Sequence, residues 1–300
     1  MNQPASDQLE HLRLAAELAG LTLDDVIPPH DASVSLRGMR FHYLDWGGDG
    51  DLILFLHGGA LTAHTWDLVC LALRGDFRCL ALDQRGHGDS DWSENLDYSI
   101  EAFAADIDAY ASELGLRRFV LVGQSLGGMA SMLYTSRDPD RVKALILVDV
   151  GPVVRLEGAN RVADFTMAPA ELDSVDEFVE KARSFNPRRD PRLLRISLLH
   201  NLRQLPNGKW TWKYDRRHLS PEGFRELTTR LGELRDDLPL ITCPALVVRG
   251  ALSDVFSDDD AAHAAGLLPN GRWIRIEGAG HNVQGDNPRA LAEELRAFLG

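Results

Sequence analysis

A serine with a glycine two residues away on each side is the strongest chemical signal in this chain of 300 residues. Ser125 lies in the run Gly123-Gln124-Ser125-Leu126-Gly127. The apolar segment 119–122 before it predicts a buried strand, and the residues that continue to about Arg137 predict a helix. A strand can pass this sharply into a helix only if the central residue is strained and its flanking positions lack side chains. The pattern therefore predicts a serine hydroxyl that stands clear at a strand end, beside a helix N-terminus.

A serine hydroxyl is a weak nucleophile near neutral pH, so a histidine base and an acid that orients it are expected nearby. Ligands of a doubly wound sheet gather at the carboxyl ends of its strands, which directs attention to residues that follow later strands. Asp254 follows the predicted strand 245–249, and His281 follows the predicted strand 273–277. We predict that these two residues and the serine are catalytic. Asp149, which also follows a strand, is the rival acid.

Each of these assignments has a structural alternative. The turn around Ser125 could be a plain glycine-rich turn with an incidental serine. Asp254 could be a helix N-cap or a solvated loop acid, and His281 could be a surface histidine. The predicted strand and helix around the serine favour the chemical interpretation.

Attack on a carbonyl group places negative charge on its oxygen, which fixed N–H donors must stabilise. The N–H of Leu126, at the start of the predicted helix, is one candidate donor. The second is expected in the loop after Leu56, where Gly59 can bring the backbone close to substrate. We predict an oxyanion hole from Gly59 and Leu126, with His57 shaping the loop rather than reacting.

Strands and helices alternate along most of the chain, which predicts an α/β fold with a doubly wound, mostly parallel sheet. Residues 47–50, a Gly-Gly-Asp-Gly run, are predicted to join two neighbouring strands as a hairpin loop. The strand candidates are 33–36, 39–46, 52–56, 77–82, 119–122, 142–150, 245–249 and 273–277, and the helix candidates include 64–73, 99–114 and 288–299.

Two segments depart from this alternation. Residues 1–30 carry apolar residues at helical spacing, so we expect an N-terminal helical arm that packs on the body, with a dimerisation arm as the alternative. Residues 152–238 lack apolar strand runs and carry a net charge of +2, whereas the remainder carries −15. We predict a core at 31–151 and 239–300 and an inserted helical lid at 152–238. The candidate substrate-binding residues of the lid are Phe165, Met167, Trp210 and Trp212. For each of them the alternative is that it packs the lid against the core.

Composition limits the partners and the compartment. The net charge of −13 argues against nucleic acid and anionic membranes, because both need a basic protein surface. Three scattered cysteines, no secretory leader and no apolar run long enough to cross a bilayer predict a cytoplasmic protein. The ten histidines show no metal-ligand spacing, so we expect no metal and no cofactor. The expected partner is a small-molecule substrate, and a homodimer is left open.

Several sequence features together resemble the α/β-hydrolase superfamily. They are Ser125 between its glycines, the His57-Gly58-Gly59 loop, the turn from Asp83 to Ser90, the Gly250-x-x-x-Asp254 loop and the Gly280-His281 loop. The likeness covers about residues 34–150 and 240–300 and is nearest to small lidded carboxylesterases, lactonases and carbon–carbon bond hydrolases. It implies a triad of Ser125, Asp254 and His281. It does not extend to the epoxide hydrolase and haloalkane dehalogenase branches, which place a carboxylate where Ser125 stands.

These observations predict a cofactor-free serine hydrolase that cleaves a carboxylic ester or lactone of a small apolar compound through an acyl-enzyme. A carbon–carbon bond hydrolase that acts on a diketone with the same triad is the first alternative. A non-catalytic ligand receptor on the same fold is the alternative from another class.

Overall fold

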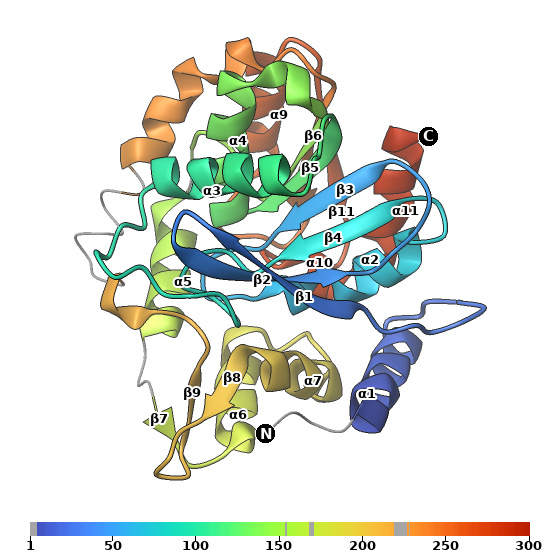
Figure 1. Cartoon of the computed structure of the whole chain (residues 1–300), viewed down its shortest axis with the longest axis vertical. Helices are drawn as coiled ribbons and strands as arrows, with labels where there is room; N and C mark the ends of the chain where they lie inside the picture. Colours follow the sequence, from blue (N-terminus) through green and yellow to red (C-terminus); the bar gives the residue numbers. More distant parts are fainter. Residues whose placement is uncertain (1–4, 154, 168–170, 219–226, 228) are drawn as a thin grey trace.

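An eight-stranded sheet forms the centre of the computed structural model, which describes residues 5–153, 155–167, 171–218, 227 and 229–300 (Figure 1). The strand order is β1-β2-β4-β3-β5-β6-β10-β11. The pairs β1–β2 and β2–β4 are antiparallel, and every further pair in the sheet is parallel. The strands are β1 (His30–Leu36), β2 (Met39–Asp45), β3 (Leu52–Leu56), β4 (Arg78–Leu82), β5 (Phe119–Gln124), β6 (Val142–Val148), β10 (Ala245–Gly250) and β11 (Gly271–Ile276).

Helices cover both faces of this sheet, as a doubly wound fold requires. Alternate side chains of β3 show the division: Leu54 and Leu56 belong to one hydrophobic core, and Ile53 and Phe55 to the other. The first core includes residues of α3 (Ile100–Glu113), α4 (Leu126–Arg137) and α9 (Asp258–Leu267). The second includes residues of α1 (Ala5–Leu18), α2 (Asp67–Leu73) and α11 (Pro288–Leu299).

The predicted hairpin at residues 47–50 is wrong. β4 lies between β2 and β3, so the strands that this loop joins are not neighbours. β3 is apolar along its whole length and lies between two parallel strands, where both of its faces are covered. The hairpin of this sheet instead joins β1 to β2 through Arg37 and Gly38, which both have positive φ, as a two-residue turn requires.

The chain leaves the sheet after β6 and returns at β10, and of the described residues in between, 171–212 form a separate layer, below the sheet in Figure 1. Leu231, Leu234 and Leu238, which the prediction placed in the lid, belong instead to the first hydrophobic core, together with α3 and α4. We therefore call residues 152–218 the lid. It is not purely helical, because it holds a three-stranded antiparallel sheet of order β7-β9-β8. These strands have two or three residues each, too few for a sequence pattern to reveal them. The described lid elements are α5 (Leu156–Met167), β7 (Glu171–Leu172), α6 (Val175–Phe185), α7 (Pro191–Asn201), β8 (Leu202–Gln204), β9 (Trp210–Trp212) and the 3₁₀ helix η3 (Arg216–His218). The 3₁₀ helix η4 (Leu234–Asp236) packs on α4 of the core.

The N-terminal helix α1 joins the lid to the core. It packs against α7 of the lid and α2 of the core, and buries Leu12, Ala15 and Ala16. Within the described residues, no helix is both long enough and apolar enough to span a membrane. The remaining short helices are η1 (Ala63–Trp66), η2 (Pro139–Arg141), η5 (Leu238–Leu240) and α10 (Val283–Asp286).

Candidate active site

Ser125 lies at the turn between β5 and α4, with φ 49° and ψ −115°. Such a backbone is strained for a residue with a side chain and persists only where its surroundings enforce it. The surroundings are tight: a Cβ on Gly123 would lie 2.5 Å from the carbonyl oxygen of Gly127, and one on Gly127 would lie 2.6 Å from that of Leu56. Both glycines are therefore needed for strand, turn and helix to approach as closely as they do.

His281 contacts an acid at the end of β6, the strand next to β5 in the sheet. Its Nδ1 lies 2.8 Å from Oδ2 of Asp149, which follows β6 and whose side chain has no exposed surface. Asp149 also accepts hydrogen bonds from the N–H of Gly250 (2.9 Å) and from the hydroxyl of Ser253 (2.6 Å). Because an ionised carboxylate only accepts, the contact places a proton on Nδ1 and leaves Nε2 with its lone pair. The amide of Gln124, next to Ser125 in sequence, lies 3.4 Å from that Nε2, so the ring lies beside the end of β5.

Asp254, the predicted acid, does not contact His281, and the assignment is corrected in favour of Asp149. The carboxylate of Asp254 pairs with Arg161 of α5, and 45% of its side chain is exposed. The residue of this loop that meets Asp149 is the preceding Ser253. The loop after β10 therefore turns Asp254 away from the sheet end and towards the lid.

Two backbone N–H groups near Ser125 are free to bind an oxyanion. Leu126 begins α4, and Gly59 is exposed in the loop after β3. Among the described residues neither N–H has a hydrogen-bond acceptor, whereas the N–H of Ala60 donates to Nε2 of His87 (3.2 Å). The predicted donors are thus unpaired, as an oxyanion hole needs.

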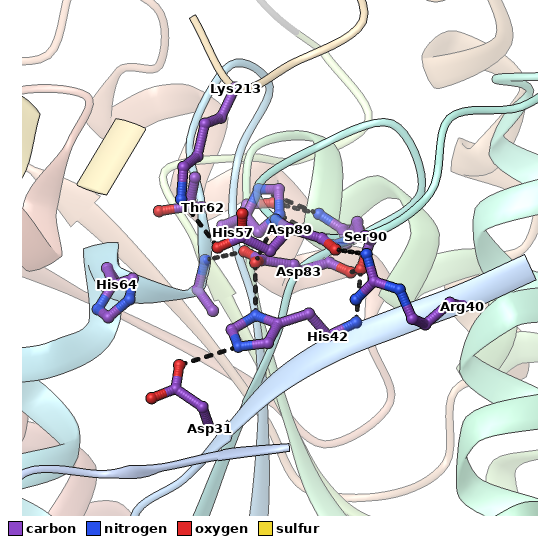
Figure 2. A network of polar contacts seen from close by, with 12 residues as sticks. Asp31, Arg40, His42, His57, Thr62, His64, Asp83, Asp89, Ser90 and Lys213 are labelled. Carbon is purple, nitrogen blue, oxygen red and sulfur yellow. Dashed lines mark hydrogen bonds and ion pairs between the residues drawn. The ribbon is translucent and has the colours of Figure 1, made fainter. Parts of the chain in front are cut away.

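A buried ion pair holds this loop in place (Figure 2). Asp83 accepts from the N–H groups of Ala63 (2.6 Å) and Asp89 (3.0 Å), and contacts Nδ1 of His42 at 2.8 Å. Burial alone lowers the pKa of His42, but hydrogen bonds with Asp31 and Asp83 outweigh it and raise the pKa to about 9. Burial likewise opposes ionisation of Asp83, yet its contact with His42 holds the pKa of the carboxyl below its usual range. The loop is therefore anchored by a charged pair at neutral pH.

His57 has the contacts of a residue that shapes the loop. Its Nε2 accepts from the N–H of Gln84 (3.0 Å), and its Nδ1 lies 2.8 Å from the carbonyl oxygen of Gly58. Burial lowers the pKa of His57, which favours the neutral ring that these contacts require.

The lid candidates lie in and around the hydrophobic core of the lid. Trp212 is 5% exposed within that core, and the ring of Phe165 lies edge-on to it with 6.0 Å between centroids. Phe165, Met167 and Trp210 are partly exposed. Ala60, in the loop after β3, packs against the same core, so the lid covers that loop directly.

Sequence reasoning ranked Asp149 below Asp254 and did not identify His42 or Gln124. One signal for Asp149 was available, because it follows a strand that lies next to the serine strand. For His42 no such signal exists, since its partners come from β1 and from the turn after β4.

Comparisons with known proteins agree with this geometry. Residues 51–288 match a family model described as alpha/beta hydrolase fold. The chain is 35% identical over 263 residues to esterase Rv0045c of Mycobacterium tuberculosis, with 85% of each chain covered. A crystal structure of that esterase has a TM-score of 0.79 and covers 99% of both chains at 32% identity. N-formylmaleamate deformylase of Pseudomonas putida is 29% identical over 89% of this chain and 95% of its own. The chain belongs to the α/β-hydrolase fold family.

Proposed function

We propose that the protein is a serine hydrolase that cleaves a carboxylic ester or lactone of a small apolar compound through an acyl-enzyme. The observation that carries this proposal is the contact between His281 and buried Asp149 at the sheet edge where Ser125 occupies a strained turn. The similarity to an esterase over 85% of the chain supports the choice of bond.

The proposed reaction uses these residues in two steps. His281 Nε2 takes the proton of the Ser125 hydroxyl as its oxygen attacks the carbonyl carbon, and Asp149 stabilises the imidazolium that forms. The N–H groups of Gly59 and Leu126 bind the oxyanion. The imidazolium then protonates the departing alcohol oxygen, which leaves an acyl group on Ser125. In the second step His281 takes a proton from water as the water oxygen attacks the acyl carbon. The bond from that carbon to Ser125 Oγ then breaks, the imidazolium returns its proton to Oγ, and the acid is released.

Within the described contacts, no hydrogen bond joins Ser125 Oγ to His281. Such bonds are often long in the absence of substrate and tighten in the complex. Asp149 fixes Nδ1, and the Gln124 amide lies 3.4 Å from Nε2, so the proton transfer requires the Ser125 hydroxyl to replace that amide at Nε2.

A Ser125→Ala variant tests the proposal with p-nitrophenyl acetate and p-nitrophenyl butyrate as substrates. We expect its turnover to fall by about a thousandfold or more, because no other group can form the acyl-enzyme. Ser136→Ala is the matched control, since this serine lies at the far end of α4 and donates only to the carbonyl of Leu133. A fluorophosphonate should add to the parent protein and to the control but not to Ser125→Ala. Retained turnover in a folded Ser125→Ala protein would refute the proposal.

The other chemistries predicted for this triad are separated by substrate. A panel of esters, lactones and diketones at equal concentration identifies the bond that is cleaved fastest. Preferred cleavage of a diketone would favour a carbon–carbon bond hydrolase, and slow turnover of the whole panel would favour a ligand receptor.

A further inference from the structure

A small cavity lies where lid, core and N-terminal helix meet. Its volume is about 70 Å³, and its walls come from α1, η1, α2, α7 and α10. Ser125 is not among its lining residues, so this cavity is separate from the proposed catalytic centre. The polar side chains that bear on the argument are Asp31, His64, Asp67, Arg189 and His200.

Three of these side chains form a cluster with metal-ligand chemistry. His64 and Asp67 lie one helical turn apart on the core side, and His200 comes from α7 of the lid. One donor atom of each lies within 4.8 Å of the others, and all three residues are partly exposed to the cavity. The two imidazole rings stack with 3.8 Å between centroids, and Nδ1 of His64 lies 3.0 Å from the Asp67 carboxylate.

We propose that His64, Asp67 and His200 bind a divalent transition-metal ion of the zinc class, and that the ion links lid helix α7 to the core. Two imidazoles and one carboxylate are a ligand set typical of zinc sites that keep a further position for water. The cavity has room for that water. The sequence predicted no metal because His200 is remote from His64 along the chain, and only folding brings them together.

The cluster must contract to hold the ion. Tetrahedral ligands at about 2.1 Å from zinc stand about 3.4 Å apart, so donor atoms that now lie within 4.8 Å of one another must approach by at most about 1.4 Å. The stacked rings must also turn so that their lone pairs converge. The cavity provides the space for this rotation, because both rings line it.

The other charges around the two rings are of both signs. Asp31 lines the cavity, and Asp83 acts on both rings from behind it. Positive groups are Arg189 in the cavity wall, Lys213, which acts on both rings, and His11, which acts on His200. The two carboxylates are matched by two permanent cations, so the ligand set and its geometry, and not the surrounding charge, carry the proposal.

Titration of the chelator-stripped full-length protein with zinc chloride in a calorimeter tests the proposal. We expect one ion per chain and a rise in the thermal midpoint that a chelator reverses. His200→Gln should weaken binding about 100-fold or more, since even the loss of an outer partner of a metal ligand costs 10–100-fold. His263→Gln removes an exposed imidazole of α9 and should bind zinc as the parent does.

The outcomes are distinct. No zinc binding by the parent, or equal affinity in the parent and His200→Gln, would overturn the proposal. If His200→Gln does not fold, Asp67→Asn replaces it, with the same expected loss. Binding of magnesium as tightly as zinc would also contradict a site built on imidazoles.

Discussion

Replacement of Asp149 by asparagine separates the two candidate acids. Asparagine preserves the size of the side chain, but its amide can donate to His281 Nδ1 and so move the ring proton to Nε2. The ring then cannot accept the proton of Ser125. The equivalent change in a serine protease lowers kcat by about 10⁴, which corresponds to about 5.5 kcal/mol of transition-state stabilisation. We expect a loss of that order here, because the 2.8 Å contact is made to a fully buried carboxylate.

Asp254→Asn is the matched control. Its partner Arg161 is 57% exposed, and exposed ion pairs contribute about 0–1 kcal/mol to stability. Because Asp254 makes no hydrogen bond with His281, we expect the activity of Asp254→Asn to stay within about twofold of that of the parent.

The assay measures, for the parent and both variants, initial rates of p-nitrophenyl butyrate hydrolysis and the thermal midpoint of unfolding. Stability must be measured because Asp149 also accepts hydrogen bonds from Gly250 and Ser253, of which asparagine keeps only part. Large loss in Asp254→Asn with activity retained in folded Asp149→Asn would refute the reasoning about the acid.

Two further predictions concern stability, one of them its dependence on pH. His42 has a folded pKa of about 9 against 6.5 unfolded, so its pairing with Asp83 stabilises fully below about pH 6.5 and is lost as the pH rises through 9. The free energy of unfolding of the parent, measured in urea, should fall by at most about 3 kcal/mol over this pH range. The fall should be smaller in His42→Gln, and an equal pH dependence of the two proteins would contradict this prediction. Gly127→Ala should lower the free energy of unfolding by about 1–3 kcal/mol because its Cβ meets backbone, whereas Gly266→Ala, which meets nothing within 4 Å, should not.

Local sequence determined the serine turn and most of the sheet. The glycines around Ser125 act on residues within the same strand–helix unit, where the need for close approach can be inferred from their spacing. Strand β3 and helix α11 begin and end at the predicted residues, since an apolar run or an amphipathic pattern is itself a local property. The order of the strands is not local, which is why the hairpin prediction at 47–50 failed.

The tertiary structure alone decided which acid meets His281. Asp149 and Asp254 both follow parallel strands, so the sequence places both at the same edge of the sheet. The turn after β10 directs Ser253 towards Asp149 and Asp254 towards Arg161, and the direction of a side chain after a turn depends on packing with distant segments. The meeting of His64 with His200 has the same origin, because α7 reaches the core only once the lid has folded over it.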